Sequence, residues 1–147
     1  MIIMISACLL GENCKYNGGS NLKEDLVSAL KGHTLIPVCP ERAGGLATPR
    51  LPSERVKDRV VNRAGEDVTE AFKKGAEETL RAALEKKPDL VILKTKSPSC
   101  GLGQVYDGTF SGRLIPGNGL TADLLLKNGF RVVTDEWEGL ADFLNAE

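Results

Sequence analysis

The chain has very little histidine, the side chain on which many hydrolytic and metal sites depend. Its 147 residues contain only one, His33, so neither a serine–histidine–acid set nor an HExxH zinc motif can be assembled. A P-loop is also absent, and no GxGxxG turn joins a predicted strand to a helix. These absences argue against the common hydrolase, zinc-peptidase and dinucleotide-binding classes.

The chain also carries almost no excess charge of either sign. Its formal net charge is −1 and its isoelectric point is near 5.9, so a nucleic-acid partner is not expected, although a small nucleoside or a locally bound RNA stays open. The apolar start has no basic leading segment and is too short to span a membrane. We therefore predict a cytoplasmic protein with no membrane partner, whose four cysteines are reduced thiols or ligands rather than disulfides.

Continuous apolar runs alternate with amphipathic segments along the chain, without an internal repeat or a linker. Such runs are typical of strands buried on both faces in a parallel sheet. The pattern predicts one domain over residues 1–147, a three-layer α/β fold of Rossmann or flavodoxin-like type with a mostly parallel sheet and helices on both faces. The predicted strands are residues 1–8, 33–41, 89–93 and 130–134, and the predicted helices are residues 21–32, 67–87, 120–129 and 136–146.

Two long segments rich in glycine, proline and polar residues interrupt this pattern. They cover residues 43–62 and 97–119, and we predict both as irregular loops. Both leave from the carboxyl ends of predicted strands, which is where open α/β sheets bind their ligands. The functional site is therefore predicted at that edge.

Three cysteines follow the predicted strands at the same edge. Cys8 ends the first strand, Cys39 ends the second, and Cys100 comes a few residues after the third. No CxxC pair is present, so their convergence follows from topology and not from a motif. A buried cysteine by itself is usually a packing residue, but three at one edge favour a shared ligand.

The residue types limit what three thiols could bind. Zinc held by three cysteines usually takes a histidine or a fourth cysteine, and His33 precedes the second strand, at the opposite end of the sheet. An iron–sulfur cluster accepts thiolates, and three of them leave one iron open to a soft atom such as sulfur. Cys14 lies near the same edge and could be a fourth ligand or a nearby thiol, but packing is the favoured interpretation.

Glu41 and two serines are the candidate proton-transfer groups near these cysteines. Glu41 comes directly after the segment Cys39–Pro40, where a carboxylate could relay protons or simply be a solvated charge. Ser97 and Ser99 flank a proline before Cys100, and each hydroxyl could contact a substrate or hold the turn.

Three further side chains are candidates for substrate binding. Arg50 could orient a planar polar substrate, or it could pair with Glu54 on the same loop. Tyr16 and Tyr106 stand in turn-rich segments of a chain with only 5% aromatic residues, which is a weak indication of stacking on a flat ring.

Five segments carry a resemblance to a known family. In chain order they are SACLLGENCKYNGG, VCPERAGGLATPR, RVVNRAGEDVTEAFKKGAEETL, ILKTKSPSCG and VYDGTFSGRLIPGNGLTADLL. They resemble the bacterial thiouracil desulfidases, a family long labelled a domain of unknown function, in its short single-domain form. The resemblance covers nearly the whole chain, and the three cysteine segments are specific.

The resemblance implies a cofactor and a reaction. Family desulfidases hold a [4Fe-4S] cluster on three cysteines, which carry over to Cys8, Cys39 and Cys100, and the fourth iron stays open. The thiocarbonyl sulfur leaves a thiolated pyrimidine, water supplies the oxygen that replaces it, and sulfide is released without net redox change. Glu41 and Ser97 match the assisting acidic residue and serine. Some members continue into an additional domain, which leaves the substrate preference open.

Two other functions stay in view. One is a non-catalytic iron–sulfur or sulfur-carrier protein, and the other is a redox enzyme that uses Cys14 and Cys8 as a dithiol pair. For the desulfidase, the partner is a small thiolated base or nucleoside. Neither the ring position that loses sulfur nor the oligomeric state follows from the sequence.

Overall fold

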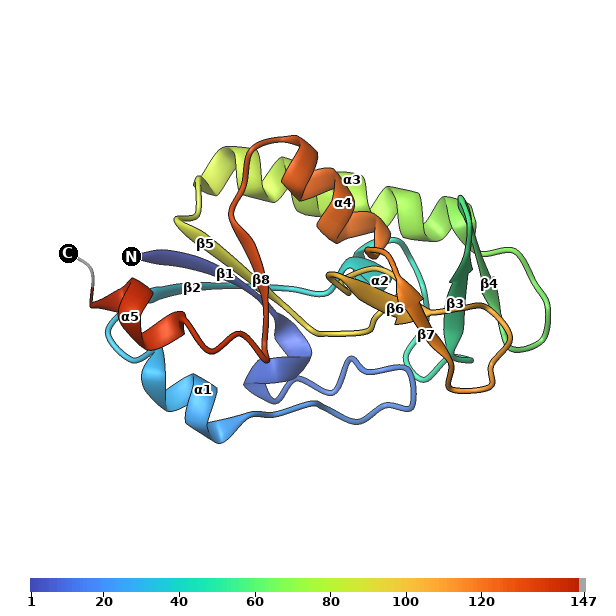
Figure 1. The fold of residues 1–147 in the computed structure, drawn as a ribbon, viewed down its shortest axis with the longest axis horizontal. Helices are drawn as coiled ribbons and strands as arrows, with labels where there is room; N and C mark the ends of the chain where they lie inside the picture. The colour runs from blue at the N-terminus through green and yellow to red at the C-terminus, as the bar shows by residue number, and fades with distance from the viewer. Residues whose placement is uncertain (146–147) are drawn as a thin grey trace.

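A four-stranded parallel sheet forms the centre of the protein. The computed structural model describes residues 1–145, and its sheet has the order β2-β1-β5-β8 with every neighbouring pair parallel (Figure 1). Parallel order brings the carboxyl ends of all four strands to one edge. The strands are β1 (Ile2–Ser6), β2 (Thr34–Val38), β5 (Leu90–Leu93) and β8 (Val132–Thr134).

Helices cover both faces of this sheet. Met4, Val91 and Leu93 point to the face covered by α3 (Thr69–Lys86) and α4 (Leu120–Lys127). Their sequence neighbours point the other way, because successive strand residues alternate between faces, and pack under α1 (Glu24–Ala29) and α5 (Leu140–Leu144). Figure 1 shows these two helix layers above and below the sheet. The predicted three-layer α/β fold is confirmed.

Several of the predicted strands and helices were too long. The first strand ends at Ser6, and residues Ala7–Leu10 form a short 3-10 helix, η1, that Gly11 ends with a left-handed φ of 97°. Cys8 therefore lies in a helical turn just after the strand. The predicted helix 21–32 is reduced to α1, and Leu22 is 48% exposed. The predicted helix 136–146 is reduced to α5, and its last position, Ala146, lies outside the described residues.

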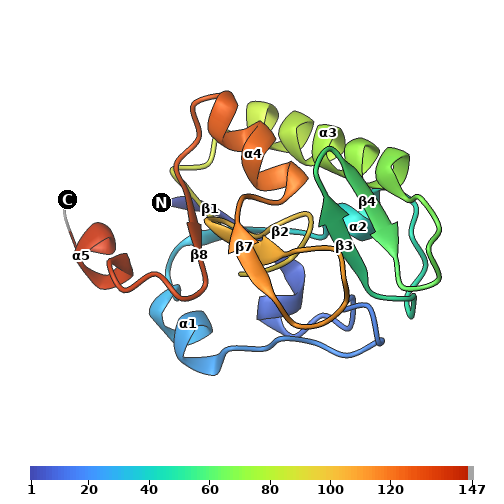
Figure 2. The ribbon, with the colours of Figure 1, turned by 45° about the vertical axis from the view of Figure 1, so that its right-hand side comes forward.

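The two segments predicted as irregular loops each contain a β-hairpin, so that prediction was wrong in part. The first segment holds β3 (Ser53–Val56) and β4 (Arg59–Asn62), and the second holds β6 (Gln104–Tyr106) and β7 (Leu114–Pro116). These strands have only three or four residues each, which is too short to show the pattern of a buried strand. Figure 1 shows both hairpins beyond the end of the central sheet, and in the turned view of Figure 2 the β3–β4 hairpin lies on the right-hand side of the molecule.

A short helix, α2 (Pro40–Ala43), replaces the predicted end of the second strand. Pro40 is at its first position, where the missing N–H is not needed and the fixed φ suits a helix. Within residues 1–145, no helix combines the length and the apolar character that crossing a membrane would require.

Candidate functional site

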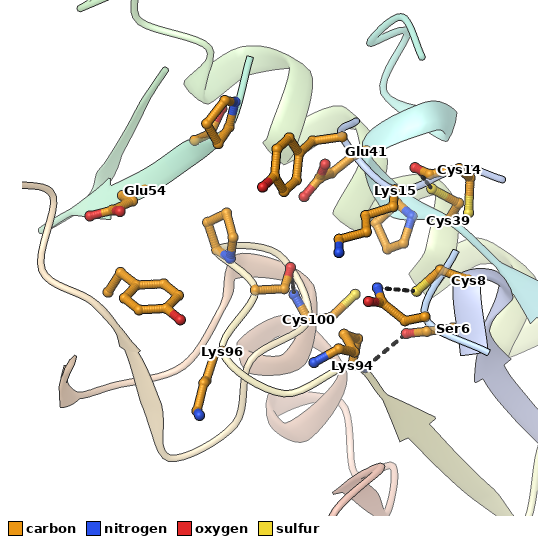
Figure 3. Close-up of a pocket in the computed structure, with 18 of the residues that line it drawn as sticks. Ser6, Cys8, Cys14, Lys15, Cys39, Glu41, Glu54, Lys94, Lys96 and Cys100 are labelled. Atoms are coloured by element: carbon orange, nitrogen blue, oxygen red, sulfur yellow. Dashed lines mark hydrogen bonds between the residues drawn. The ribbon is translucent and has the colours of Figure 1, made fainter. Parts of the chain in front are cut away.

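A cavity of about 510 Å³ lies between the carboxyl edge of the sheet and the two hairpins. Its volume is within the range of small-molecule sites, roughly 300–1,000 Å³. All four cysteines are among its lining residues, and Figure 3 shows them together on one side with Glu54 on the other. The edge predicted from the sequence is therefore the edge that carries the cavity.

The three candidate ligand cysteines come from three different elements and have three different partners. Cys8 lies on η1, and its Sγ accepts a hydrogen bond from Asn21 Nδ2 at 3.3 Å. Cys39 lies between β2 and α2, and its Sγ is 4.0 Å from the Cys14 carbonyl oxygen. Cys100 is 5% exposed, and its backbone N–H donates to Ser97 Oγ at 3.0 Å.

Cys14 joins the other cysteines at the cavity. It is 2% exposed and lies beside Cys39, and the packing role that the sequence favoured for it stays a prediction. Burial raises the pKa of Cys14 to about 12, and its neighbour Cys39 adds to that effect. Burial also raises the pKa values of Cys8 and Cys100, although Asn21 opposes the change at Cys8. The cavity thus holds four thiols.

This donor set fits a cluster better than a single ion. Within residues 1–145, no three His, Cys, Asp or Glu side chains are close enough together to hold one metal ion. In an iron–sulfur cluster each thiolate binds a different iron, so the sulfur atoms stand farther apart. Burial opposes ionisation of Cys8 and Cys100, and a cationic iron–sulfur core would stabilise their thiolate forms. His33 contacts the Met1 amino group at 3.1 Å, at the other end of the sheet.

Two glycines bring α2, and with it Cys39, directly against α3. A Cβ added at Gly75 would lie 1.8 Å from the Pro40 carbonyl oxygen, and one at Gly44 would lie 2.0 Å from the Ala71 carbonyl oxygen. The two backbones are therefore in contact, and any side chain at either position would separate them. A glycine in the middle of an amphipathic helix costs roughly 1 kcal/mol relative to alanine. The presence of Gly75 in the predicted helix 67–87 could therefore have indicated a close packing contact.

Arg50 holds Glu41 at the mouth of the cavity. Its Nε donates to Glu41 Oε2 at 2.8 Å, and its Nη2 donates both to that oxygen and to the Cys14 carbonyl. Its Nη1 donates to Ala47 O and Thr48 Oγ1, each at 3.1 Å. All five guanidinium N–H groups thus have protein partners. Two expectations are corrected: Arg50 pairs with Glu41 and not with Glu54, and it has no donor left for a substrate.

Ser97 and Ser99 have different environments. Ser97 lines the cavity, and its Oγ accepts the N–H groups of Ser99 at 3.1 Å and Cys100 at 3.0 Å, so its own O–H is free to donate elsewhere. Ser99 is 1% exposed, and its Oγ lies 2.6 Å from Thr121 Oγ1 at the start of α4. The expected substrate contact of Ser99 is therefore corrected to a structural one, because its hydroxyl faces the helix.

Both predicted tyrosines line the cavity, together with cationic side chains that the sequence analysis passed over. Tyr16 is half-exposed at the rim, and Tyr106 stands on β6. None of the missed cations forms an ion pair with a carboxylate within residues 1–145. Two of them flank Thr95 in the segment KTKSPSCG, and this pair of lysines before Cys100 could have indicated a cationic group at the site. The missed cations are Lys15, Arg63, Lys94 and Lys96.

The fold and the site together define an α/β protein with a thiol-lined pocket for a small ligand at the carboxyl edge of its sheet. Comparison with known proteins identifies the family within this class. The sequence model of the 2-thiouracil desulfurase family matches residues 3–137, and the chain belongs to this family. The resemblance identified in the sequence is thereby confirmed.

Two relatives support the same assignment. The chain is 41% identical, over 144 aligned residues, to the uncharacterized protein YbbK of Bacillus subtilis (strain 168), covering 91% of this chain and 95% of that protein. It is also similar to a solved structure described as the [4Fe-4S]-dependent thiouracil desulfidase TudS. That similarity has a TM-score of 0.90 and 40% sequence identity, over 99% of this chain and 98% of that one.

Proposed function

We propose that this protein is a [4Fe-4S]-dependent desulfidase that replaces the thiocarbonyl sulfur of a thiouracil-type pyrimidine by oxygen. The balanced reaction consumes one water, breaks the C–S bond, forms a C–O bond and releases hydrogen sulfide, with no net oxidation or reduction. The observation that carries the proposal is the group of cysteines around one small cavity in a chain 40% identical to TudS.

Cys8, Cys39 and Cys100 are the proposed cluster ligands. They come from the ends of three adjacent parallel strands, whereas Cys14 lies beside Cys39 on a loop. A fourth ligand would have to stand apart from each of the other three, and a thiol next to Cys39 does not. When bound, the cluster supplies an open, Lewis-acidic iron for a soft thiocarbonyl sulfur.

Glu41 and Ser97 are the proposed catalytic residues. Arg50 binds only one oxygen of the Glu41 carboxylate, Oε2, so Oε1 is free to take a proton from the attacking water. The two N–H groups that hold Ser97 Oγ leave its O–H to donate to the ring as negative charge develops there. Arg50 acts through Glu41 as a positioning residue.

Aromatic and cationic side chains complete the proposed substrate pocket. Tyr106 and Tyr16 offer flat faces to a pyrimidine ring. Lys94 lines the same cavity, and within residues 1–145 its ammonium group hydrogen-bonds only to the Thr95 carbonyl, at 3.3 Å. Its ammonium group is available to balance the negative charge that the released sulfide brings.

The test uses protein reconstituted with iron and sulfide in the absence of air. We expect 2-thiouracil or 4-thiouracil to lose its thiocarbonyl absorbance while sulfide accumulates, and the uracil product to contain heavy oxygen when the reaction is run in H₂¹⁸O. Cys100→Ala should abolish turnover, and Cys14→Ala is the matched control that should keep both the cluster and the activity. An intact cluster without turnover of either compound would favour the non-catalytic carrier instead.

A further inference from the structure

A second carboxylate, Glu54, faces the cavity from the side opposite the cysteines (Figure 3). It stands on β3 and is only 9% exposed. Its Oε1 accepts two backbone hydrogen bonds, from Gly108 N at 3.0 Å and from Phe110 N at 3.1 Å. Both donors belong to the loop between β6 and β7, more than fifty residues away in the sequence.

The loop rests directly on β3. A Cβ added at Gly108 would lie 2.3 Å from Val56 Cγ2, and the residue has a left-handed φ of 96°, so only glycine fits there. Phe110 also has a positive φ, 56°, which a bulky side chain seldom adopts without external support. Two N–H groups aimed at one carboxylate oxygen supply that support.

The residue after Glu54 holds the other end of the same segment. Arg55 donates from Nη1 to the Asn118 carbonyl oxygen and from Nε to the Lys57 carbonyl oxygen at 2.8 Å. Neighbouring side chains of β3 therefore hold the segment 107–118 at two points. Phe110, which Glu54 holds by its N–H, lines the cavity, as Tyr106 does just before the segment.

We propose that Glu54 is a positioning residue for substrate binding. Its carboxylate holds the β6–β7 loop against β3, and this fixes the aromatic side of the cavity, on which a planar ring would stack. The inference rests on the proposed function for the identity of that ring. Oε1 of Glu54 is occupied by two N–H donors, so any proton transfer would have to use Oε2, and the kinetics of Glu54→Gln separate that role from holding the loop.

The first measurement is amide hydrogen exchange at Gly108 and Phe110 in the purified protein. Losing a hydrogen bond to a charged acceptor should speed exchange at both amides by roughly 10- to 100-fold in Glu54→Ala. Glu54→Gln keeps the acceptor oxygen and should show a smaller increase. Glu66→Ala removes another hydrogen-bonded carboxylate, in the turn that follows β4, and is the matched control, expected to leave both amides unchanged.

The second measurement is steady-state kinetics of the reconstituted variants with thiouracil. A loosened wall should raise KM on the order of 10-fold in Glu54→Ala, with kcat held within a few-fold, because ordering the loop then has to be done by the substrate. Glu54→Gln should lie between the wild type and Glu54→Ala.

The proposal is overturned if Glu54→Gln loses kcat while the exchange of both amides stays as in the wild type, since Glu54 would then act on the proton. It is also overturned if Glu54→Ala leaves the two amides protected. If the wild-type protein shows no turnover, the proposed function has failed, but the exchange data still decide whether Glu54 holds the loop. If Glu54→Ala does not fold, Glu54→Gln provides both readouts.

Discussion

The cavity has two walls that are built in different ways. The strand-end wall consists of the turns after β1, β2 and β5, with Cys8, Cys39 and Cys100, and two of these strands, β1 and β5, are almost fully buried. The hairpin wall consists of β3, β4, β6 and β7 and carries Tyr106. It is held by single side chains, such as Glu54, that bond to a distant backbone.

This difference separates two tasks. Ligands for a cluster have to be placed within a fraction of an ångström, and buried parallel strands with a fixed register provide that. A wall that only has to fit a ring tolerates adjustment, and hydrogen bonds from a few side chains are sufficient for it. Substitutions in the strand-end wall should therefore affect the cofactor, whereas those in the hairpin wall should affect substrate binding.

The largest effect is expected on bound iron, when one side chain of each wall is replaced by alanine and the two variants are compared. Cys39→Ala should lose most of the bound iron and the visible absorbance after anaerobic reconstitution, because a ligand is gone. Tyr106→Ala should keep both and instead weaken thiouracil binding. Iron per chain and the absorbance spectrum make the comparison, and loss of iron in both variants to the same extent would show that the two walls are not separate.

Gly75→Ala tests the support beneath the strand-end wall. Its new methyl group would overlap the Pro40 carbonyl, so α2 has to shift and the free energy of unfolding should fall by about 1–3 kcal/mol. Urea denaturation measures the change. Lys74→Ala, at an exposed neighbouring position of the same helix, is the control and should stay within about 0.5 kcal/mol of the wild type. Equal stability of the two variants would contradict the close contact.

Ser99→Ala distinguishes the two serines of the strand-end wall. Removing the Ser99 hydroxyl leaves that of Thr121 buried without its partner, which should cost roughly 1–3 kcal/mol of stability. The rate per folded molecule should not change, whereas Ser97→Ala should lower kcat. Thermal unfolding and activity, measured on both variants, distinguish a structural role from a catalytic one. A lowered kcat in Ser99→Ala would show that Ser99 contacts the substrate after all.

The smallest effect is expected on the pH dependence of stability, from Asp67, which follows β4 in the hairpin wall. Hydrogen bonds from Thr69 and Arg59 lower the pKa of Asp67 to about 2, against about 3.9 in an unfolded chain. The ionised carboxylate therefore supports the fold above its unfolded pKa, and this contribution is lost as the pH falls through the folded value. Asp67→Asn should flatten the loss of stability between pH 4 and 2, and carbon NMR of the carboxyl should report the titration directly. A titration near 4 would contradict the assignment.

The central sheet could be predicted because its signal is local. Leu90–Leu93 is a run of four buried residues, and such runs separated by amphipathic helices define an α/β fold from patterning alone. The hairpins could not be predicted in this way. Strands such as Ser53–Val56 owe their conformation to their partners and not to a buried apolar face.

The candidate site also has a part that could be predicted from local sequence patterns and a part that could not. That Cys8, Cys39 and Cys100 meet at one edge followed from the strand pattern and the rule that parallel strands end together. The partner of Arg50 and the direction of Ser99 depend on how separate turns and helices pack together, and neither has a local pattern.

The sequence by itself determined the α/β class, the family and the edge of the sheet that carries the thiols, because burial of apolar strands and parallel order leave few alternatives. Only the tertiary structure decided which carboxylate Arg50 holds, which serine faces the cavity and how Glu54 holds the aromatic wall. The physical reason is that these hydrogen bonds join residues between nine and 56 positions apart, and the folded backbone selects them by where it brings donor and acceptor together.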